Sequence, residues 1–369
     1  MVNAEQTKKR ILSIDALRGF DMMWIIGFGM FLRLAGRASG TDIGSAIADQ
    51  MEHVRWDGLH LHDLIFPIFI FLAGASWPFS LGAQREKGVP EGKIFLRLVR
   101  RFVVLFVLGL MTSGIMRFDF LHTRYMSVLG RVSCAWFVAA LTLFLCGPRK
   151  TVFVAAFVFV GYFLASRFVP LIVEPGCDPW GWSTNLVSMF DKWLTPRHYR
   201  EWGGEGVISA FGGASGCAYL GVFAGLILKR VDWTESRKSA MLAVFSISLS
   251  FAAVLASLVS PCVKVLWSAT FVLMASSVAM AWLSLFHWLI DVKGWVGWSL
   301  FFRVIGMNAI TIYVLRCYVD LSVVSRRLFI GPIKMLPEHW HNPAITGGAF
   351  VVAWCFLYFL YRKKVFIKV

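Results

Sequence analysis

The chain has 369 residues, of which 58% are hydrophobic, and its formal net charge at pH 7 is +16. Soluble domains are roughly 45–50% apolar, so this composition, with a mean hydropathy of +0.67, excludes an ordinary soluble protein. The positive charge does not indicate nucleic-acid binding, because no soluble basic domain is present to carry such a surface.

Runs of about 20 apolar residues recur along the chain, each long enough to cross a hydrocarbon core roughly 30 Å thick. These runs predict an all-α fold, a polytopic transmembrane helical bundle that forms a single domain over residues 1–369. We expect no cleavable signal, because the first ten residues lead straight into a charged first span. The predicted spans are about 15–35, 59–81, 97–115, 126–147, 151–173, 205–228, 239–258, 266–290, 299–320 and 347–361.

The placement of lysine and arginine predicts the orientation of the bundle. Cytoplasmic loops are enriched in these residues. With the N-terminus inside, the predicted inner segments hold 20 of the 37 lysines and arginines, although the outer segments are longer. We therefore expect both termini to be cytoplasmic.

Several polar side chains fall inside predicted spans. A charge there costs at least about 2.5–3.5 kcal/mol, so such residues usually face the bundle interior and have partners. Asp15 and Arg18, three residues apart on one helical face, suggest a structural ion pair at the inner surface. The other candidates are Asp21, Asp63, Arg131, Glu205, Arg303, Asn308, Arg316 and Asp320.

Three histidines lie at the start of the second span, in "MEHVRWDGLHLHDLIFPIFIFLAGASWPFS" at 51–80. A zinc site is disfavoured, because His60 and His62 are two residues apart and would point away from each other on a helix. Exposed interfacial histidine is the simpler interpretation for both. His53 precedes Trp56 on the water side of the span, where a neutral imidazole can act as nucleophile or general base.

The outer segment 174–204 is rich in tryptophan, proline and glycine. Its aromatic residues fit either a belt at the membrane surface or a lid that faces carbohydrate. Both interpretations stay open. Cys177 and Cys262 also fall in outer segments, where they could pair in an oxidising compartment.

Six segments in chain order resemble the heparan-α-glucosaminide N-acetyltransferase family. They are "SIDALRGFDMMWIIG", "HVRWDGLHLHDLIFPIFIFLAGASWPFS", "RYMSVLGRVSCAWF", "EGVISAFGGASGCAYLGVFAG", "KVLWSATFVL" and "GMNAITIYV". The resemblance covers essentially the whole chain. It implies a transmembrane acetyltransferase that moves acetyl from cytosolic acetyl-CoA to the amino group of a glucosamine-type sugar on the outer face.

The resemblance also implies a set of site residues, of which His53 matches the catalytic histidine of the family. We expect Asn308 to stabilise the oxyanion and Asp63 to orient a histidine or bind the sugar ammonium. For Asn308, an interhelical hydrogen bond is the alternative. Expected contacts to acetyl-CoA are Arg131, Trp267, Ser268 and Arg18, and expected acceptor contacts are Glu205, Trp56 and Asp57.

The implied chemistry has two routes. His53 either attacks the thioester and carries the acetyl group, or removes a proton from the attacking amine. Acetyl-CoA is then a co-substrate and no metal is expected. Expected partners are an amino sugar or glycan and membrane lipid, but no nucleic acid. A homodimer is left open.

The sequence departs from the lysosomal members of the family. Gly29 replaces an asparagine, Gly130 a glutamine, and Gly203–Gly204 an Asp-Pro pair. The chain looks closer to a bacterial branch often labelled N-acetylglucosamine-related transporter, so we expect the bacterial inner membrane. That label supplies the alternative function, a transporter of N-acetylglucosamine or related amino sugars. Against it, the chain shows no repeat that pairs broken helices.

Overall fold

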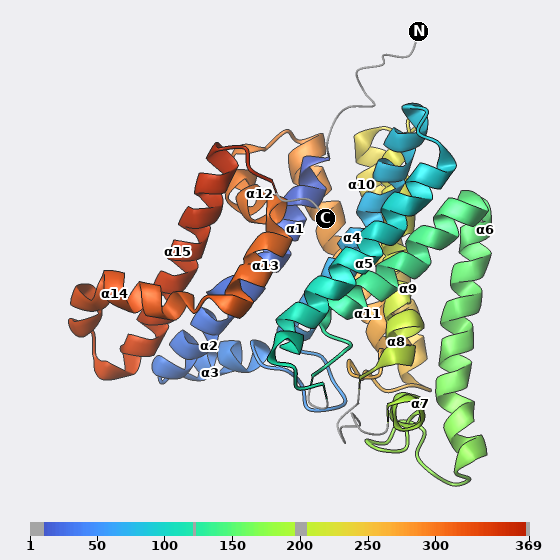
Figure 1. Cartoon of the computed structure of the whole chain (residues 1–369), viewed down its shortest axis with the longest axis horizontal. Helices are drawn as coiled ribbons and strands as arrows, with labels where there is room; N and C mark the ends of the chain where they lie inside the picture. Colours follow the sequence, from blue (N-terminus) through green and yellow to red (C-terminus); the bar gives the residue numbers. More distant parts are fainter. Residues whose placement is uncertain (1–10, 121–122, 196–204, 367–369) are drawn as a thin grey trace.

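The computed structural model describes residues 11–120, 123–195 and 205–366. In these ranges the regular structure is helical, apart from one isolated β-bridge between Asp57 and Val263, and the all-α prediction is confirmed (Figure 1). The α-helices are α1 Leu12–Met23, α2 Gly29–Ala38, α3 Asp42–Gln50, α4 Leu61–Glu86, α5 Glu91–Thr112, α6 Val128–Val173, α7 Leu186–Leu194, α8 Val207–Phe211, α9 Gly213–Lys229, α10 Glu235–Ser257, α11 Ala269–His287, α12 Leu300–Met307, α13 Ala309–Tyr318, α14 Leu321–Lys334 and α15 His341–Arg362.

Seven stretches in the described ranges are long and apolar enough to cross a membrane, and a bent pair of helices raises the number to eight. The bent pair is Gly297–Met307 with Ala309–Tyr318, which meet at 55°. Helix α5 is not among them, because charged residues fill its first turns. The number ten therefore stays a prediction.

Two of the predicted spans, 126–147 and 151–173, lie in the single helix α6. A straight helix of its 46 residues would be about 69 Å long, more than twice the thickness of a hydrocarbon core. Gly147 breaks it with φ 70° and ψ 173°, a conformation that glycine reaches without a Cβ clash. The second limb therefore turns back beside the first (Figure 1), so α6 provides two limbs of membrane-spanning length.

Helix α4 is the most deeply buried of the candidate spans. It packs backbone to backbone on α9: a Cβ added to Gly74 would lie 2.1 Å from the Ala218 carbonyl oxygen, and one on Gly221 would lie 1.9 Å from that of Phe71. Small residues permit such close approach, which is a main source of packing energy between helices in lipid. Helix α4 is thereby held along its length.

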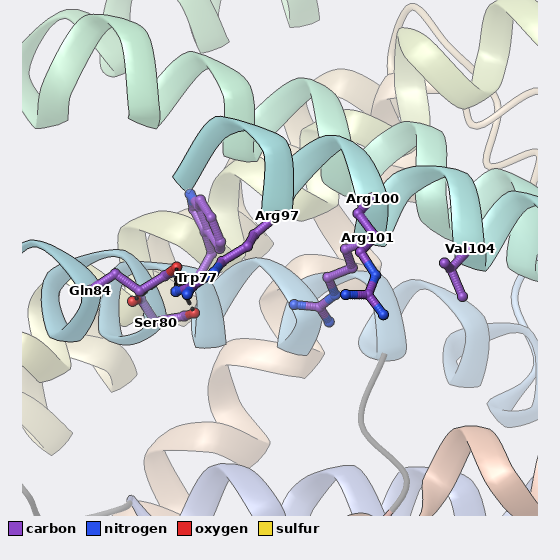
Figure 2. Close-up of a pocket in the computed structure, with 7 residues that line it drawn as sticks. All are labelled: Trp77, Ser80, Gln84, Arg97, Arg100, Arg101 and Val104. Carbon is purple, nitrogen blue, oxygen red and sulfur yellow. Dashed lines mark hydrogen bonds between the residues drawn. The ribbon is translucent and has the colours of Figure 1, made fainter. Parts of the chain in front are cut away.

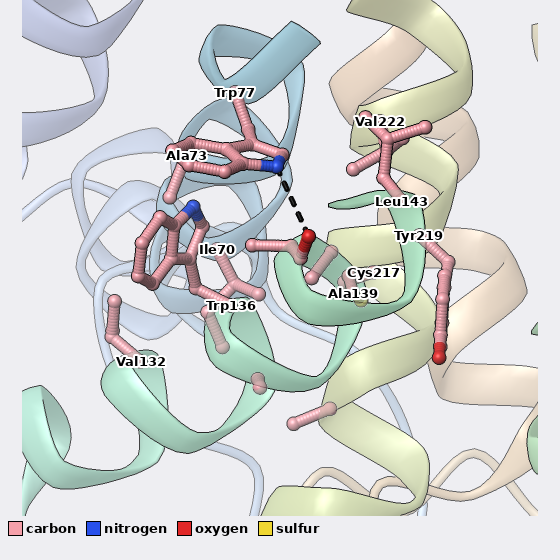
Figure 3. Packing of buried hydrophobic residues seen from close by; sticks show 14 of the residues in the cluster. Ile70, Ala73, Trp77, Val132, Trp136, Ala139, Leu143, Cys217, Tyr219 and Val222 are labelled. Carbon is pink, nitrogen blue, oxygen red and sulfur yellow. Dashed lines mark hydrogen bonds between the residues drawn. The ribbon is translucent and has the colours of Figure 1, made fainter. Parts of the chain in front are cut away.

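Two tryptophans join α4 to α6 in the core (Figure 3). The Trp77 indole N–H donates to the Ala140 carbonyl at 3.1 Å, and its ring meets Trp136 edge to face at 5.4 Å between centroids. The Arg101 guanidinium of α5 lies 4.3 Å from the Trp136 ring centroid. Helices α4, α5 and α6 are therefore linked at this level.

The first span, Leu12–Ala38, is one candidate crossing with a break in it. A π-helical turn occupies Trp24–Phe28, and Gly27 there has φ 144°. Such turns are rare and leave backbone groups outside the regular α-helical ladder. The described cysteines are free, so Cys177 and Cys262 are not bridged.

Candidate active site

His53 and Asp63 form a hydrogen-bonded pair at the N-terminal end of α4. The His53 Nδ1 lies 2.8 Å from Asp63 Oδ1. The Asp63 side chain is 1% exposed, whereas that of His53 is 57% exposed. A buried carboxylate thus holds an imidazole whose other face remains open to solvent.

The local sequence explains why Asp63 is fixed. It lies in the first turn of α4, where the helix dipole favours negative charge. Its Oδ2 accepts backbone N–H groups from His60 at 3.1 Å and from Val54 at 3.3 Å. The His60 ring nitrogen Nδ1 in turn lies 3.0 Å from the Glu52 carbonyl. The same carboxylate therefore caps the helix and orders the preceding loop, which carries His53.

Lys264 completes this site; it is the first residue of the "KVLWSATFVL" segment, but no role was predicted for it. Its Nζ lies 3.1 Å from Asp63 Oδ1 and 3.1 Å from His53 Nδ1. Burial lowers the pKa of Lys264 below its ordinary value, and the ion pair with Asp63 opposes that shift. The three side chains come from residues up to 211 positions apart.

A short pairing of two loops brings Lys264 to Asp63. Asp57 and Val263 form the antiparallel bridge, and the Gly58 N–H donates to the Cys262 carbonyl at 3.0 Å. The Asp57 carboxylate accepts the Cys262 N–H at 2.8 Å. Asp57, expected to contact the acceptor, therefore fastens the loop that carries Lys264.

The contact with Asp63 favours one tautomer of His53. Each imidazole nitrogen of a neutral ring is either a donor or an acceptor. A carboxylate only accepts, so with Asp63 ionised Nδ1 carries the proton of that hydrogen bond. Lys264 donates to the same oxygen, and its contact with Nδ1 is then a contact between two donors rather than a hydrogen bond. The Nε2 of His53 is then left with its lone pair, as a nucleophile or general base requires.

His62 lies beside this group rather than apart from it. Its ring centroid is 4.6 Å from that of His53, so the expectation that His62 is simply an exposed interfacial residue is wrong. His60 is the N-cap residue of α4. Within the described ranges, no three His, Cys, Asp or Glu side chains gather as they would around a metal ion.

Trp56 links the site to the outer segment that precedes α7. Its indole N–H donates to the Trp180 carbonyl at 3.0 Å, and its ring lies 4.7 Å from Trp182 between centroids. Part of the Trp-rich segment therefore packs over the loop next to His53. Residues 196–204 of the predicted belt or lid, Gly203–Gly204 included, lie outside the described residues.

Trp267 and Ser268, expected to contact acetyl-CoA, instead build the loop around Lys264. Trp267 is 1% exposed and packs edge to face on Phe66 at 5.3 Å. The Ser268 hydroxyl donates to the Pro261 carbonyl at 2.7 Å and accepts the Val263 N–H at 3.0 Å. Both positions favour a structural role.

Arg131 and Glu205 lie together in a second buried group. The Arg131 Nη2 donates to the Glu205 backbone carbonyl at 2.8 Å, and the Glu205 carboxylate accepts the Met126 N–H at 2.7 Å. Asp191 accepts the Gly206 N–H at 2.6 Å, and burial raises its pKa. Glu205 is thus tied to the backbone rather than aimed at an acceptor.

Asn308 lies at the break between α12 and α13. Its side-chain N–H donates to the Val365 carbonyl at 3.0 Å. This contact is to the segment after α15 and is not the interhelical hydrogen bond anticipated as the alternative, so the role of Asn308 stays a prediction.

An arginine-lined pocket lies between the C-terminal half of α4 and the middle of α5 (Figure 2). Its volume is about 450 Å³. The Arg97 guanidinium donates to Gln84 at 2.9 Å. The Arg101 Nε is buried and has no hydrogen-bond acceptor within the described residues. The lining residues are Trp77, Ser80, Gln84, Arg97, Arg100, Arg101 and Val104.

Arg18 adjoins this pocket. Its Nη2 donates to the Ser76 hydroxyl at 2.6 Å, one turn before Ser80, and its charge acts on Arg101. The predicted pair with Asp15 also forms, at 3.3 Å. Among the expected acetyl-CoA contacts, Arg18 is the one that the fold places beside a pocket suited to phosphate.

Two known proteins are similar to this chain over most of its length. It is 23% identical over 424 residues to heparan-alpha-glucosaminide N-acetyltransferase of Homo sapiens. This alignment covers 98% of this chain and 60% of the human protein. The Mus musculus protein of the same name is 25% identical over 384 residues, which covers 86% of this chain and 56% of the mouse protein. The family resemblance is confirmed. No protein-family model matches the chain.

The chain therefore spans about 60% of the length of the acetyltransferases that it matches. The names of these relatives describe those proteins, and the site residues of this chain are described from its own structure. One further feature of the sequence indicates a specific role for Lys264. Lys264 is the only charged residue between Lys238 and Asp291, and an isolated charge in a long apolar stretch indicates a specific partner.

Proposed function

We propose that this chain is a transmembrane acetyltransferase. It transfers the acetyl group of acetyl-CoA to the amino group of a glucosamine-type sugar at the outer face of the membrane. The observation that carries the proposal is the His53–Asp63 pair, in which the His53 side chain is 57% exposed and the Asp63 side chain is 1% exposed. The names of the similar proteins support the reaction class.

The two ends of α4 suit the two substrates. Asp63 lies at one end and Ser80 at the other, about 25 Å apart along the helix. The arginines near Ser80 match the phosphates of coenzyme A, because guanidinium groups bind phosphate by paired, charge-assisted hydrogen bonds. The lysine and arginine distribution supports an inner position for this end. A donor held there would direct its thioester along the bundle toward His53.

The chemistry at His53 has two balanced forms. In the first, Nε2 attacks the thioester carbonyl carbon, the C–S bond breaks, and coenzyme A leaves as a thiolate that takes up a proton. The sugar amine then displaces the imidazole from the acetyl group and loses a proton. In the second, the amine attacks the thioester directly while Nε2 accepts the amine proton and the C–S bond breaks.

The remaining expected roles belong to this proposal as well. Asn308 and Arg131 would donate to the oxyanion that either route develops on the thioester oxygen. Trp56 would offer the sugar a flat face near His53. We further propose the bacterial inner membrane as the location of the chain.

The test is acetyl transfer in proteoliposomes that contain the purified chain, radiolabelled acetyl-CoA and glucosamine. His53→Ala should lower the rate by on the order of a hundredfold or more, because the acid–base or nucleophilic group is lost. His339→Ala is the matched control, since His339 is exposed on a different segment. Label retained on the wild-type protein before sugar is added would favour the acetyl-histidine route.

Two results would count against the proposal. The assignment of His53 as the reacting group fails if His53→Ala transfers acetyl as fast as wild type. If neither protein transfers acetyl but both carry N-acetylglucosamine across the vesicle wall, the chain is a transporter.

A further inference from the structure

Lys264 shares one oxygen atom with His53. Its Nζ and the His53 Nδ1 lie 3.1 Å and 2.8 Å from Asp63 Oδ1, and the two nitrogens lie 3.1 Å from each other. The side chain of Lys264 is 24% exposed and that of Asp63 is 1% exposed. The ammonium group is therefore in direct contact with both members of the pair.

This arrangement sets the charge of the site. An adjacent anion favours the cationic form of an imidazole, and an adjacent cation disfavours it. With Lys264 present, a neutral ring leaves the three side chains with no net charge. Protonation of the ring would then add a positive charge beside an existing one.

Several other titratable groups near His53 and Lys264 are neutral or positively charged. His62 faces His53 from α4 at 4.6 Å between ring centroids. Arg33 of α2 acts on His62, and Arg131 of α6 acts on Lys264. These neighbours are neutral or cationic, so Asp63 is the anion in direct contact with the His53 ring among the described residues.

We propose that Lys264 is a positioning residue that keeps the His53 imidazole neutral and its Nε2 reactive. It does so by holding Asp63 as a carboxylate and by opposing positive charge on the ring. The inference rests on the proposed function, in which Nε2 is the reacting atom. It applies to both routes, because each begins from an unprotonated Nε2.

The loop geometry supports this role. The Asp57–Val263 bridge lies directly before Lys264, and the Lys264 carbonyl accepts the Trp267 N–H at 3.0 Å. Trp267 has a left-handed backbone, with φ 51°, and is buried in the core. Because the backbone on both sides of Lys264 is fixed, its ammonium group stays beside Asp63 and His53.

The test measures the reactivity of His53 with diethyl pyrocarbonate, which acylates neutral imidazole. The purified full-length chain in detergent is labelled between about pH 5 and pH 8, and mass spectrometry gives the rate at His53. The variants are Lys264→Met, Lys264→Gln and Lys264→Arg. His339 in the same digest is the internal control, and thermal unfolding shows which variants fold.

We expect the midpoint of the His53 labelling profile to move up by about one pH unit in Lys264→Met and Lys264→Gln. Below the midpoint this is about a tenfold slower rate. Lys264→Arg should keep the wild-type midpoint because it keeps the charge, and His339 should not change in any variant. The inference is overturned if either neutral variant folds and keeps the wild-type midpoint, or if Lys264→Arg shifts as far as Lys264→Met.

The labelling reaction needs neither acetyl-CoA nor an acceptor sugar. A shifted midpoint in a chain that transfers no acetyl group would therefore refute the proposed function and leave the role of Lys264 intact. An unshifted midpoint in an active acetyltransferase would do the opposite.

Discussion

At the scale of single residues, the sequence around His53 predicted a role for this side chain before the fold was known. Its position outside an apolar run, in a segment similar to an acetyltransferase family, indicated a reactive imidazole. The structure adds a physical reason for that expectation, since a hydrogen bond from Nδ1–H to the Asp63 carboxylate favours a neutral ring with its lone pair on Nε2. Asp63 was expected to orient a histidine or to bind the sugar ammonium, and its contact to His53 matches the first of these expectations.

Arg100 offers a test of the donor pocket at the scale of one side chain. It is exposed and lines the pocket, so Arg100→Gln should leave the fold intact. We expect the KM for acetyl-CoA to rise by about tenfold, which corresponds to one charge-assisted hydrogen bond. The KM for glucosamine should stay the same. Steady-state kinetics in proteoliposomes measure both constants.

A second donor sharpens that test. S-acetylpantetheine lacks the phosphates, so Arg100→Gln should have no effect on its KM. Arg149→Gln is the control protein, because Arg149 is also exposed on the predicted inner side but lies outside the pocket. An equal rise in KM for both donors would show that Arg100 does not contact phosphate.

At the scale of helices, the hydrophobic runs located the elements but not how they bend. The run at 126–147 and the run at 151–173 are limbs of one helix, and the first span contains a π-turn. Both breaks lie at glycines with positive φ, Gly147 and Gly27. A sequence shows where glycine permits such a conformation, but packing decides which glycine adopts it.

The contact between α4 and α9 predicts a pair of glycine variants with different outcomes. In Gly221→Ala the new methyl group would meet the Phe71 carbonyl at 1.9 Å, so the helices must move apart. We expect a loss of about 1–3 kcal/mol in the free energy of unfolding. Thermal unfolding in detergent, with size-exclusion profiles, provides the measurement.

The matched control is Gly161→Ala in α6. No atom lies within 4 Å of the added Cβ, and alanine favours a helix by up to about 1 kcal/mol over glycine. Its unfolding temperature should equal or exceed that of wild type. If Gly221→Ala is as stable as Gly161→Ala, the close contact between α4 and α9 does not exist in the membrane.

At the scale of the whole molecule, the arrangement predicts that the two substrates act from opposite sides. The arginine pocket and His53 lie toward opposite ends of α4, and phosphates do not cross hydrocarbon. In right-side-out membrane vesicles, transfer to external glucosamine should require acetyl-CoA loaded inside. Acetyl-CoA added only to the outside should give at most a small fraction of that rate.

Inverted vesicles reverse the requirement and serve as the comparison. There, external acetyl-CoA should acetylate glucosamine trapped in the lumen. Detergent should abolish the dependence on side in both preparations. Equal rates from both sides in sealed vesicles would contradict the proposed orientation, whatever the role of His53.

The sequence by itself determined that this is a helical membrane protein, because apolar runs of this length form stable helices in the hydrocarbon core of a membrane. It also determined the family resemblance and drew attention to His53, since both depend on local motifs. Only the tertiary structure decided that Lys264 joins His53 and Asp63, and that Trp267, Ser268 and Asp57 build the loop that carries Lys264. These contacts join residues about 200 positions apart, and the pairing of two outer loops that creates them leaves no periodic pattern in the sequence.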